Sequence, residues 1–346
     1  MLIKRAFVSG FWMVGLLFVI LPLSPWSPVT PTGSLIATCP SFPFDNVWNA
    51  RVDSLPVHAS SSTWVNAIGS GTGLHPDFGS SDWPPGSGMP IGIPYTTVFG
   101  SQPPVTITYA ITGYPGESDP GPFPIPPNAP IEGGNFITNT GDRHVLVVDR
   151  DNCILYELYN AWRQPDNSWQ VYQSSKFDLR SNALRPATWT SADAAGLPIF
   201  AGLARADEVA AGEINHALRF TVDGTNNSYI WPARHRTNYN YSPNKPPMGA
   251  RFRLKATYLI PSNFSPQTKI ILTALKKYGM IVADNGSNWY ISGAPDPNWD
   301  DGNLVPELSQ VKGSNLEAVD ESAWMVDSNS GRFAIKTIFL PALLRP

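Results

Sequence analysis

Two glutamates are the side chains of this sequence best suited to acid–base chemistry. Glu157 is flanked by Tyr156, Leu158 and Tyr159, and these apolar neighbours are expected to raise the pKa of its carboxyl group by desolvation. Glu132 lies in the stretch Ala-Pro-Ile-Glu-Gly-Gly, a loop of the kind that commonly carries functional groups. Glycoside hydrolysis needs one carboxyl group that stays protonated and a second that ionises. We therefore assign Glu157 as the candidate acid and Glu132 as its partner.

His144 is expected to accompany Glu157 because the stretch GDRHVLVVDRDNCILYELY resembles a β-hairpin. A loop of two or four residues pairs Val148 with Cys153 and places His144 opposite Glu157 on one face of the sheet. His144 could then orient the carboxyl group or share a proton with it. The structural alternative stays open, in which Glu157 is an ordinary partner on a half-exposed sheet and Glu132 accepts hydrogen bonds in a turn.

A second group of residues could bind a sugar. Residues 214–222 and 228–235 are predicted to form another hairpin that brings histidine and arginine side chains to one end, where they could bind hydroxyl or carboxylate groups. Exposed tryptophan faces can stack on sugar rings. The candidate substrate-binding residues are Trp189, Asp193, His216, Arg234, His235 and Trp289. The alternative is structural, with a rim that donates to loop carbonyls and tryptophans that belong to the core.

Several chemistries find no support in the sequence. It contains no Cys/His spacing of a zinc site, no H-E-x-x-H, no P-loop, no G-x-G-x-x-G and no G-x-S-x-G. We therefore expect no metal and no cofactor. Lys and Arg number 24 against 27 Asp and Glu, a net charge of −3, so nucleic acid is not an expected partner.

The first 38 residues are typical of export. Lys4 and Arg5 precede an apolar stretch over residues 6–23, and a Pro/Ser/Thr-rich linker follows over residues 25–38. This arrangement predicts a secreted or extracellular protein whose signal is either cleaved or retained as an anchor, the one expected contact with a membrane. Cys39 and Cys153 are the two cysteines of the chain. Export favours a disulfide between them, with two unpaired thiols as the alternative.

The elements that must position these residues are predicted to be mainly strands. Proline numbers 35 and glycine 28, which argues against a helical bundle. Short β-like runs separated by turns predict a β-sandwich or jelly roll with a few short helices. The expected helices cover residues 204–212, 265–278 and 305–311. Residues 39–325 are expected to form one β-rich domain, as a single body or two packed lobes, with a tail over residues 326–346.

Long stretches of the chain resemble a family of uncharacterised exported bacterial proteins. The similarity covers residues 39–320 and is carried by ESDPGPFPIP, GDRHVLVVD, WTSADAAGLPIF, WPARH and ADNGSNWYISG. The resemblance implies an exported protein built on one shared body, and it implies no activity.

These observations predict an exported enzyme that acts on extracellular polysaccharide, most simply a glycoside hydrolase with paired carboxylates. One alternative is a polysaccharide lyase, which abstracts a proton next to a uronate while an arginine screens the carboxylate. The residues that could serve the lyase reaction are His144, Tyr156, His216 and Arg234. The other alternative is a non-catalytic carbohydrate-binding or cell-wall protein, in which Trp189 and Trp289 matter and no carboxylate does.

Overall fold

The structure, a computed structural model, describes residues 35–36, 39–136 and 140–334. These residues belong to one unit of the chain, Thr32–Pro346. The segment predicted to act as a signal or anchor lies outside the described residues. Within the described ranges, no helix has the length and apolar character needed to cross a membrane.

A four-stranded sheet contains the hairpin predicted around Glu157. Its strands, in spatial order, are β10 (Gln173–Asp178), β7 (Ile154–Tyr159), β6 (Val145–Asp149) and β4 (Tyr95–Val98). A smaller sheet contains β5 (Ile107–Tyr109), β9 (Trp169–Val171) and β8 (Trp162–Arg163). Ile107 and Trp169 of the smaller sheet share a buried apolar cluster with Val147 and Leu158 of the larger one. This packing covers one face of β6, whose residues are all buried, as expected of an uninterrupted apolar strand.

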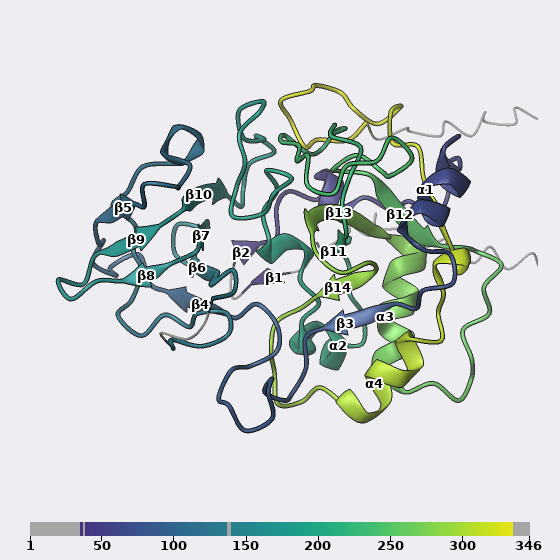
Figure 1. The fold of residues 1–346 in the computed structure, drawn as a ribbon, viewed down its shortest axis with the longest axis horizontal. Coiled ribbons are helices and arrows are strands. Elements are labelled where there is room, and N and C mark those ends of the chain that lie inside the picture. Colours follow the sequence, from purple (N-terminus) through teal and green to yellow (C-terminus); the bar gives the residue numbers. More distant parts are fainter. Residues whose placement is uncertain (1–34, 37–38, 137–139, 335–346) are drawn as a thin grey trace, which may run out of the picture. The chain divides into compact units, whose positions relative to one another are not determined.

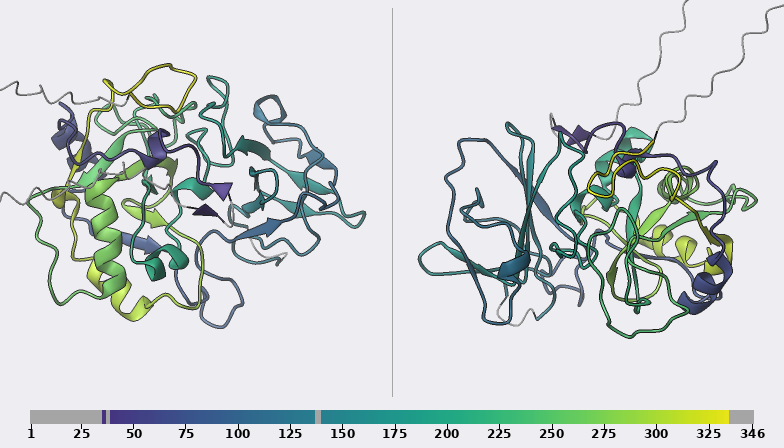
Figure 2. Two further views of the ribbon diagram at one scale, coloured as in Figure 1. Left: turned by 180° about the vertical axis from the view of Figure 1, so that it is seen from behind. Right: turned by 90° about the horizontal axis from the view of Figure 1, so that it is seen from above.

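A six-stranded sheet forms the second large layer. Its strands, in spatial order, are β15 (Leu316–Ala318), β12 (Arg251–Leu254), β13 (Met280–Asn285), β11 (Leu218–Val222), β14 (Tyr290–Ser292) and β3 (His75–Asp77). Figure 1 shows this sheet together with α3 and α4 on one side, and the strands β4 to β10 on the other. Figure 2 shows the same two groups from behind and from above. A short pair, β1 (Leu35–Ile36) and β2 (Cys39–Pro40), completes the described strands.

Local capping signals account for the helices. The Ser265 hydroxyl accepts a hydrogen bond from the N–H of Thr268, and Pro266 occupies the first helical position. The short helix before Gly212 ends there with the glycine at φ 100°, a conformation that favours glycine. The described helices are α1 (Ser61–Ile68), α2 (Ala206–Ala211), α3 (Pro266–Lys277) and α4 (Asp301–Leu308), with 3-10 turns η1 (Val47–Asn49), η2 (Pro115–Glu117), η3 (Phe200–Gly202) and η4 (Gly313–Asn315). The sequence predicts α2 and α3 closely and places α4 four residues late, and it does not predict α1.

The expected mainly β fold with a few short helices is confirmed in the described residues. The sheets are mixed, because the pairs β4/β6, β5/β9, β11/β13 and β14/β3 are parallel. Parallel neighbours require long crossover connections, and the chain between β11 and β13 accordingly passes through β12 and α3.

The hairpin of β6 and β7 forms with a register two residues away from the prediction. Val148 pairs with Leu155 and not with Cys153. A shift of two residues leaves each side chain on its original face. His144 and Glu157 therefore share a face as diagonal neighbours, and the prediction that they pair directly is wrong.

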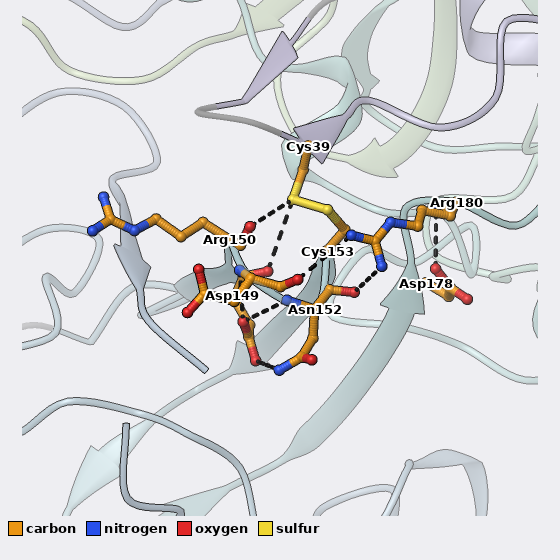
Figure 3. Close-up of a disulfide and its surroundings, with 8 residues drawn as sticks. Cys39, Asp149, Arg150, Asn152, Cys153, Asp178 and Arg180 are labelled. Carbon is orange, nitrogen blue, oxygen red and sulfur yellow. Dashed lines mark hydrogen bonds between the residues drawn. A yellow bond between two sulfur atoms is a disulfide. The ribbon is translucent and has the colours of Figure 1, made fainter. Parts of the chain in front are cut away.

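The turn between these strands explains the shifted register, and it lies beside the disulfide. The Asp149 carboxylate accepts hydrogen bonds from the N–H groups of Asp151 (3.1 Å) and Asn152 (3.0 Å), and Cys153 adopts φ 55°. The turn thereby takes up residues 150–153. Figure 3 shows Cys39 of β2 joined to Cys153, the last residue of this turn. The predicted disulfide is confirmed, with a Cα–Cα distance of 5.4 Å.

The second predicted hairpin does not form. Residues 228–235 contain no strand, and Tyr229 makes a single isolated bridge with Met248. The partners of β11 are β13 and β14 instead. Partners that lie about sixty residues further along the chain thus replace the local one expected from the sequence.

The domain extends beyond residue 325. The N–H of Ala334 donates to the carbonyl of Trp324 (2.9 Å), and the Phe333 and Trp324 ring centroids are 5.4 Å apart. Residues 326–334, which were expected to belong to a tail, therefore pack on the domain. The rest of the predicted tail lies outside the described residues.

Candidate functional site

A polar pocket of about 760 Å³ lies where loops from the two large sheets meet. Its volume falls in the range of small-molecule and cofactor sites, roughly 300–1,000 Å³. Its lining residues come from the start of η2, the ends of β6, β7, β11 and β13, and two long loops. They are Tyr114, Asp142, Tyr159, Thr190, Ser191, Ala192, Ala194, Asp223, His235, Thr237, Asn238, Tyr239, Asn240, Asp284, Asn285, Gly286 and Ser287.

Asp284 is a lining residue whose carboxyl pKa is raised well above its usual range. It stands near the end of β13, where a carboxylate oxygen lies 3.8 Å from the guanidinium of Arg219. That guanidinium is already committed, because it donates two hydrogen bonds to Asp193 at 2.8 and 2.9 Å. Burial, reinforced by the charges of Asp193 and Asp142, raises the pKa of Asp284 well above its usual range. Asp193 thus takes the counter-ion, and the raised pKa favours the protonated form of Asp284.

Asp142 supplies a second carboxylate to the same pocket. It is exposed, directly before Arg143, whose backbone adopts φ 52°. The carbonyl of Asp142 accepts a hydrogen bond from the N–H of Asn160 at 2.8 Å, which ties this loop to the end of β7. Asp142 is close enough to Asp284 for its charge to help raise the pKa of that carboxyl group. An exposed aspartate and a half-buried one with a raised pKa therefore occupy one pocket.

The pKa of the Tyr159 hydroxyl responds to the charges of both acids. It is the last residue of β7, and its ring centroid is 5.6 Å from that of His144. Burial, together with the charges of Asp142 and Asp284, raises the pKa of the Tyr159 hydroxyl to about 12. The phenol therefore stays neutral and can donate a hydrogen bond at physiological pH.

His235 stands at another wall of the pocket. Its Nδ1 donates to the carbonyl of Ala194 at 2.8 Å, and its Nε2 lies 3.9 Å from a carboxylate oxygen of Glu117. The same Glu117 oxygen accepts a hydrogen bond from the N–H of Thr190 at 2.8 Å. This contact links η2 to the loop that contains Asp193. Of the residues predicted to bind substrate, His235 lines the pocket.

The predicted acid, Glu157, does not reach this pocket. It is fully buried on β7, and its two carboxylate oxygens accept hydrogen bonds from the N–H groups of Ile199 (3.0 Å) and Phe200 (2.9 Å). Burial raises the pKa of Glu157 to about 7, partly offset by these two hydrogen bonds. The raised pKa follows from the apolar flanks seen in the sequence, but the group holds η3 against the four-stranded sheet instead of lining a cleft.

His144 pairs with Glu132 instead of with Glu157, in an arrangement that braces the fold. The His144 Nδ1 lies 2.6 Å from a Glu132 carboxylate oxygen, and the Nε2 lies 3.0 Å from the carbonyl of Ala192. Despite burial, the adjacent Glu132 charge raises the pKa of His144 to about 9. The doubly donating imidazolium therefore links the Glu132 loop to the loop that lines the pocket, and its ring nitrogens are both occupied.

The other predicted substrate-binding residues have structural contacts. His216 is buried with Nε2 3.1 Å from Glu208, and Arg234 donates to the carbonyl of Arg185 and to Asn329. Trp289 is fully buried and stacks on Phe220. None of these three residues lines the pocket. Asp193 and Trp189 do not line the pocket either. Asp193 is fully buried against Arg219 and acts on the pocket through it, and Trp189 is half-buried with the Arg185 guanidinium 5.6 Å from its ring centroid.

The pocket residues that sequence reasoning misses share one positional signal. Asp142 and Asp284 each stand near a strand end, beside Gly141 and before Asn285–Gly286, where loop-borne functional groups are common. Four of the sequence segments quoted above also contribute lining residues: GDRHVLVVD with Asp142, WTSADAAGLPIF with Thr190, Ser191, Ala192 and Ala194, WPARH with His235, and ADNGSNWYISG with Asp284.

No group of three His, Cys, Asp or Glu residues within the described ranges is placed to hold a metal ion. No family model matches the chain, and comparisons with curated proteins and with solved structures find no match. The chemistry of the pocket is therefore argued from its own residues.

Proposed function

We propose that the protein is an exported polysaccharide-active enzyme, a glycoside hydrolase whose catalytic carboxyl groups are Asp284 and Asp142. One observation carries the proposal: Asp284, a half-buried carboxyl group whose pKa burial raises, and the exposed Asp142 line one pocket. Glycoside hydrolysis requires two carboxyl groups of which one can hold a proton, and the raised pKa of Asp284 suits it to that role.

In this reaction Asp284 donates its proton to the glycosidic oxygen as the bond to the anomeric carbon breaks. Asp142 either attacks the anomeric carbon or takes a proton from the attacking water, and the anomer of the first product distinguishes these routes. The neutral Tyr159 hydroxyl can donate a hydrogen bond to the sugar or to Asp142. If Asp142 attacks, water then hydrolyses the bond between Asp142 and the sugar while Asp284 takes the proton of that water. If Asp142 instead takes a proton from the attacking water, it releases that proton to solvent and Asp284 regains one from solvent.

Export supports an extracellular substrate. The basic and apolar N-terminal residues predict secretion, and the Cys39–Cys153 disulfide is typical of proteins that fold in oxidising compartments. Extracellular polysaccharide is the partner that these features favour.

A lyase is less well supported than a hydrolase. The histidines and arginine considered for that reaction, His144, His216 and Arg234, are all buried with partners. Among the described residues that line the pocket there is no Arg or Lys to screen a uronate carboxylate. His235 and Tyr159 remain as candidate bases, so a lyase stays the second candidate.

A glycan panel tests the class of reaction. The secreted protein is incubated with soluble α- and β-glucans, xylan, mannan, chitin oligosaccharides and polyuronates, with readouts of new reducing ends and of the absorbance of unsaturated products. New reducing ends without the absorbance are expected. Absorbance would establish the lyase, and binding without either product would establish a carbohydrate-binding protein.

Two variants connect any activity to this pocket. Asp284→Asn and Asp142→Asn should each lower turnover at least a hundredfold, the usual scale of acid–base catalysis. Asp166→Asn is the matched control, because Asp166 is exposed in a turn and bonds only to Ser168. Full activity in both pocket variants would refute the assignment.

A further inference from the structure

We infer that the pocket takes an uncharged or amine-bearing glycan and excludes glycans that carry carboxylate or sulfate groups. The inference rests on the proposed function and names the substrate class of the same site. It follows from the charges that face the pocket and from the contacts that neutralise the nearby cations.

The lining is acidic. Asp142, Asp223 and Asp284 line the pocket, with Glu117 3.9 Å from the His235 ring that also lines it. No Arg or Lys occurs among the lining residues that the structure describes. Even with Asp284 protonated, the fixed charge that meets a ligand is negative, and like charges in a partly desolvated site repel strongly.

Two buried arginines close to lining residues are engaged elsewhere, and the exposed Arg236, which is not a lining residue, donates to the carbonyl of Asn227. Arg219, which lies 3.8 Å from Asp284, donates two hydrogen bonds to Asp193. Arg143, next to Asp142 in sequence, is buried with its guanidinium 3.6 Å from the centroid of the Trp162 ring, and it donates to the carbonyl of Ala161. These two arginines are buried, and the described lining offers no Arg or Lys to pair with an anionic substrate.

Lys245 compensates only one of the carboxylates. Its ammonium lies 3.0 Å from the Asp223 carboxylate and 3.1 Å from the carbonyl of Asn240. The lysine side chain is only 10% exposed, whereas that of Asp223 is 44% exposed. Lys245 therefore fixes the loop around Asn240 and does not present its charge to a ligand.

The remaining lining groups suit hydroxyl-rich, uncharged sugars. Asn238 and Ser287 offer neutral donors and acceptors. Tyr114 and Tyr239 come from separate loops and are 47% and 64% exposed. Exposed aromatic rings of this kind provide apolar faces against which sugar rings can stack.

Charge-altered forms of one polysaccharide test the inference. Each panel polysaccharide is used as the native, the carboxymethylated and the diethylaminoethyl form, with affinity and cleavage measured at low and high salt. The carboxymethylated form should bind at least tenfold more weakly than the native form at low salt. Added salt should reduce this difference in affinity, because it screens the repulsion between the carboxylates of the ligand and those of the pocket. The aminated form should bind at least as well as the native form.

A charge placed on the rim provides the second arm. Asn238→Lys should raise the affinity for the carboxymethylated form relative to the native form, whereas Ser101→Lys, an exposed position outside the pocket, should leave that ratio unchanged. If the carboxymethylated form is cleaved as well as or better than the native form, and this cleavage requires Asp284, the inference about charge is overturned and the proposed hydrolase function still stands. If no form of any polysaccharide is bound or cleaved, the proposed function fails first and the inference fails with it.

Discussion

Asp193 and Asp284 both lie near the guanidinium of Arg219, and the way they share it affects the pKa of Asp284. Asp193 receives two hydrogen bonds from the Arg219 guanidinium, which also donates to Ser292, while the nearest Asp284 oxygen lies 3.8 Å away. Partial burial without a close counter-ion favours the neutral form of a carboxyl group. The commitment of Arg219 to Asp193 therefore leaves the pKa of Asp284 raised, as the proposed role of general acid requires.

Asp284 should titrate well above the exposed aspartates. Carboxyl carbon NMR of the protein labelled at aspartate, assigned with Asp284→Asn, should show that Asp284 loses its proton at a higher pH than the exposed aspartates, because burial raises its pKa. If Asp284 ionises together with the exposed aspartates, the assignment of its role fails.

Glu157 should make stability depend on pH near neutrality. Its folded pKa of about 7 lies above the unfolded value of about 4.3. Protonation then favours the folded state below pH 4, and that contribution is lost as pH rises through 7. The free energy of unfolding should fall by roughly 2–4 kcal/mol between pH 4 and pH 8 because of this group.

Urea unfolding of wild type and Glu157→Gln at several pH values isolates this contribution. The variant should lose that part of the pH slope, because an amide does not titrate. Glu213→Gln, at an exposed position, serves as control. An unchanged slope in Glu157→Gln would contradict the folded pKa.

At the scale of elements, β7 has the disulfide at its start and the pocket at its end. Cys153 precedes its first residue and Tyr159 is its last. Six residues of extended strand span roughly 20 Å. The disulfide and the pocket therefore lie at opposite ends of one rigid strand. Removing the disulfide should lower the free energy of unfolding and leave the geometry of the pocket unchanged.

The double variant Cys39→Ser, Cys153→Ser tests this separation. The disulfide closes a loop with a sequence separation of 114 residues, and its removal should cost about 2–5 kcal/mol of unfolding free energy. Turnover of the folded protein should stay within twofold of wild type. Unchanged stability, or a large loss of turnover in the folded variant, would refute the separation.

The same strand shows what could be predicted from the sequence. The apolar runs predict β6 and β7, and capping residues predict α2 and α3, because these signals are local. The register slips by two residues because the Asp149 carboxylate binds the N–H groups of Asp151 and Asn152, and such side-chain bonds decide how many residues a turn takes up.

At the scale of the whole molecule, the pocket depends on contacts between distant parts of the chain. Asp142, Asp193, Arg219 and Asp284 come from four separate elements or loops. No spacing rule relates them, so the flanks of Glu157 correctly indicate a raised pKa but not which carboxyl group faces a cavity. Likewise, β11 pairs with distant strands and leaves His216 and His235 apart.

The hydrolase account places a general acid at Asp284, and leaving-group dependence tests that role most directly. A general acid matters when the departing oxygen is strongly basic and matters little when the leaving group departs unaided. Turnover of wild type and Asp284→Asn is therefore compared on the glycan cleaved in the panel and on the dinitrophenyl glycoside of the same sugar. The account predicts at least a hundredfold loss on the glycan and less than a tenfold loss on the dinitrophenyl glycoside. Equal losses on both substrates, or no loss on the glycan, would contradict it.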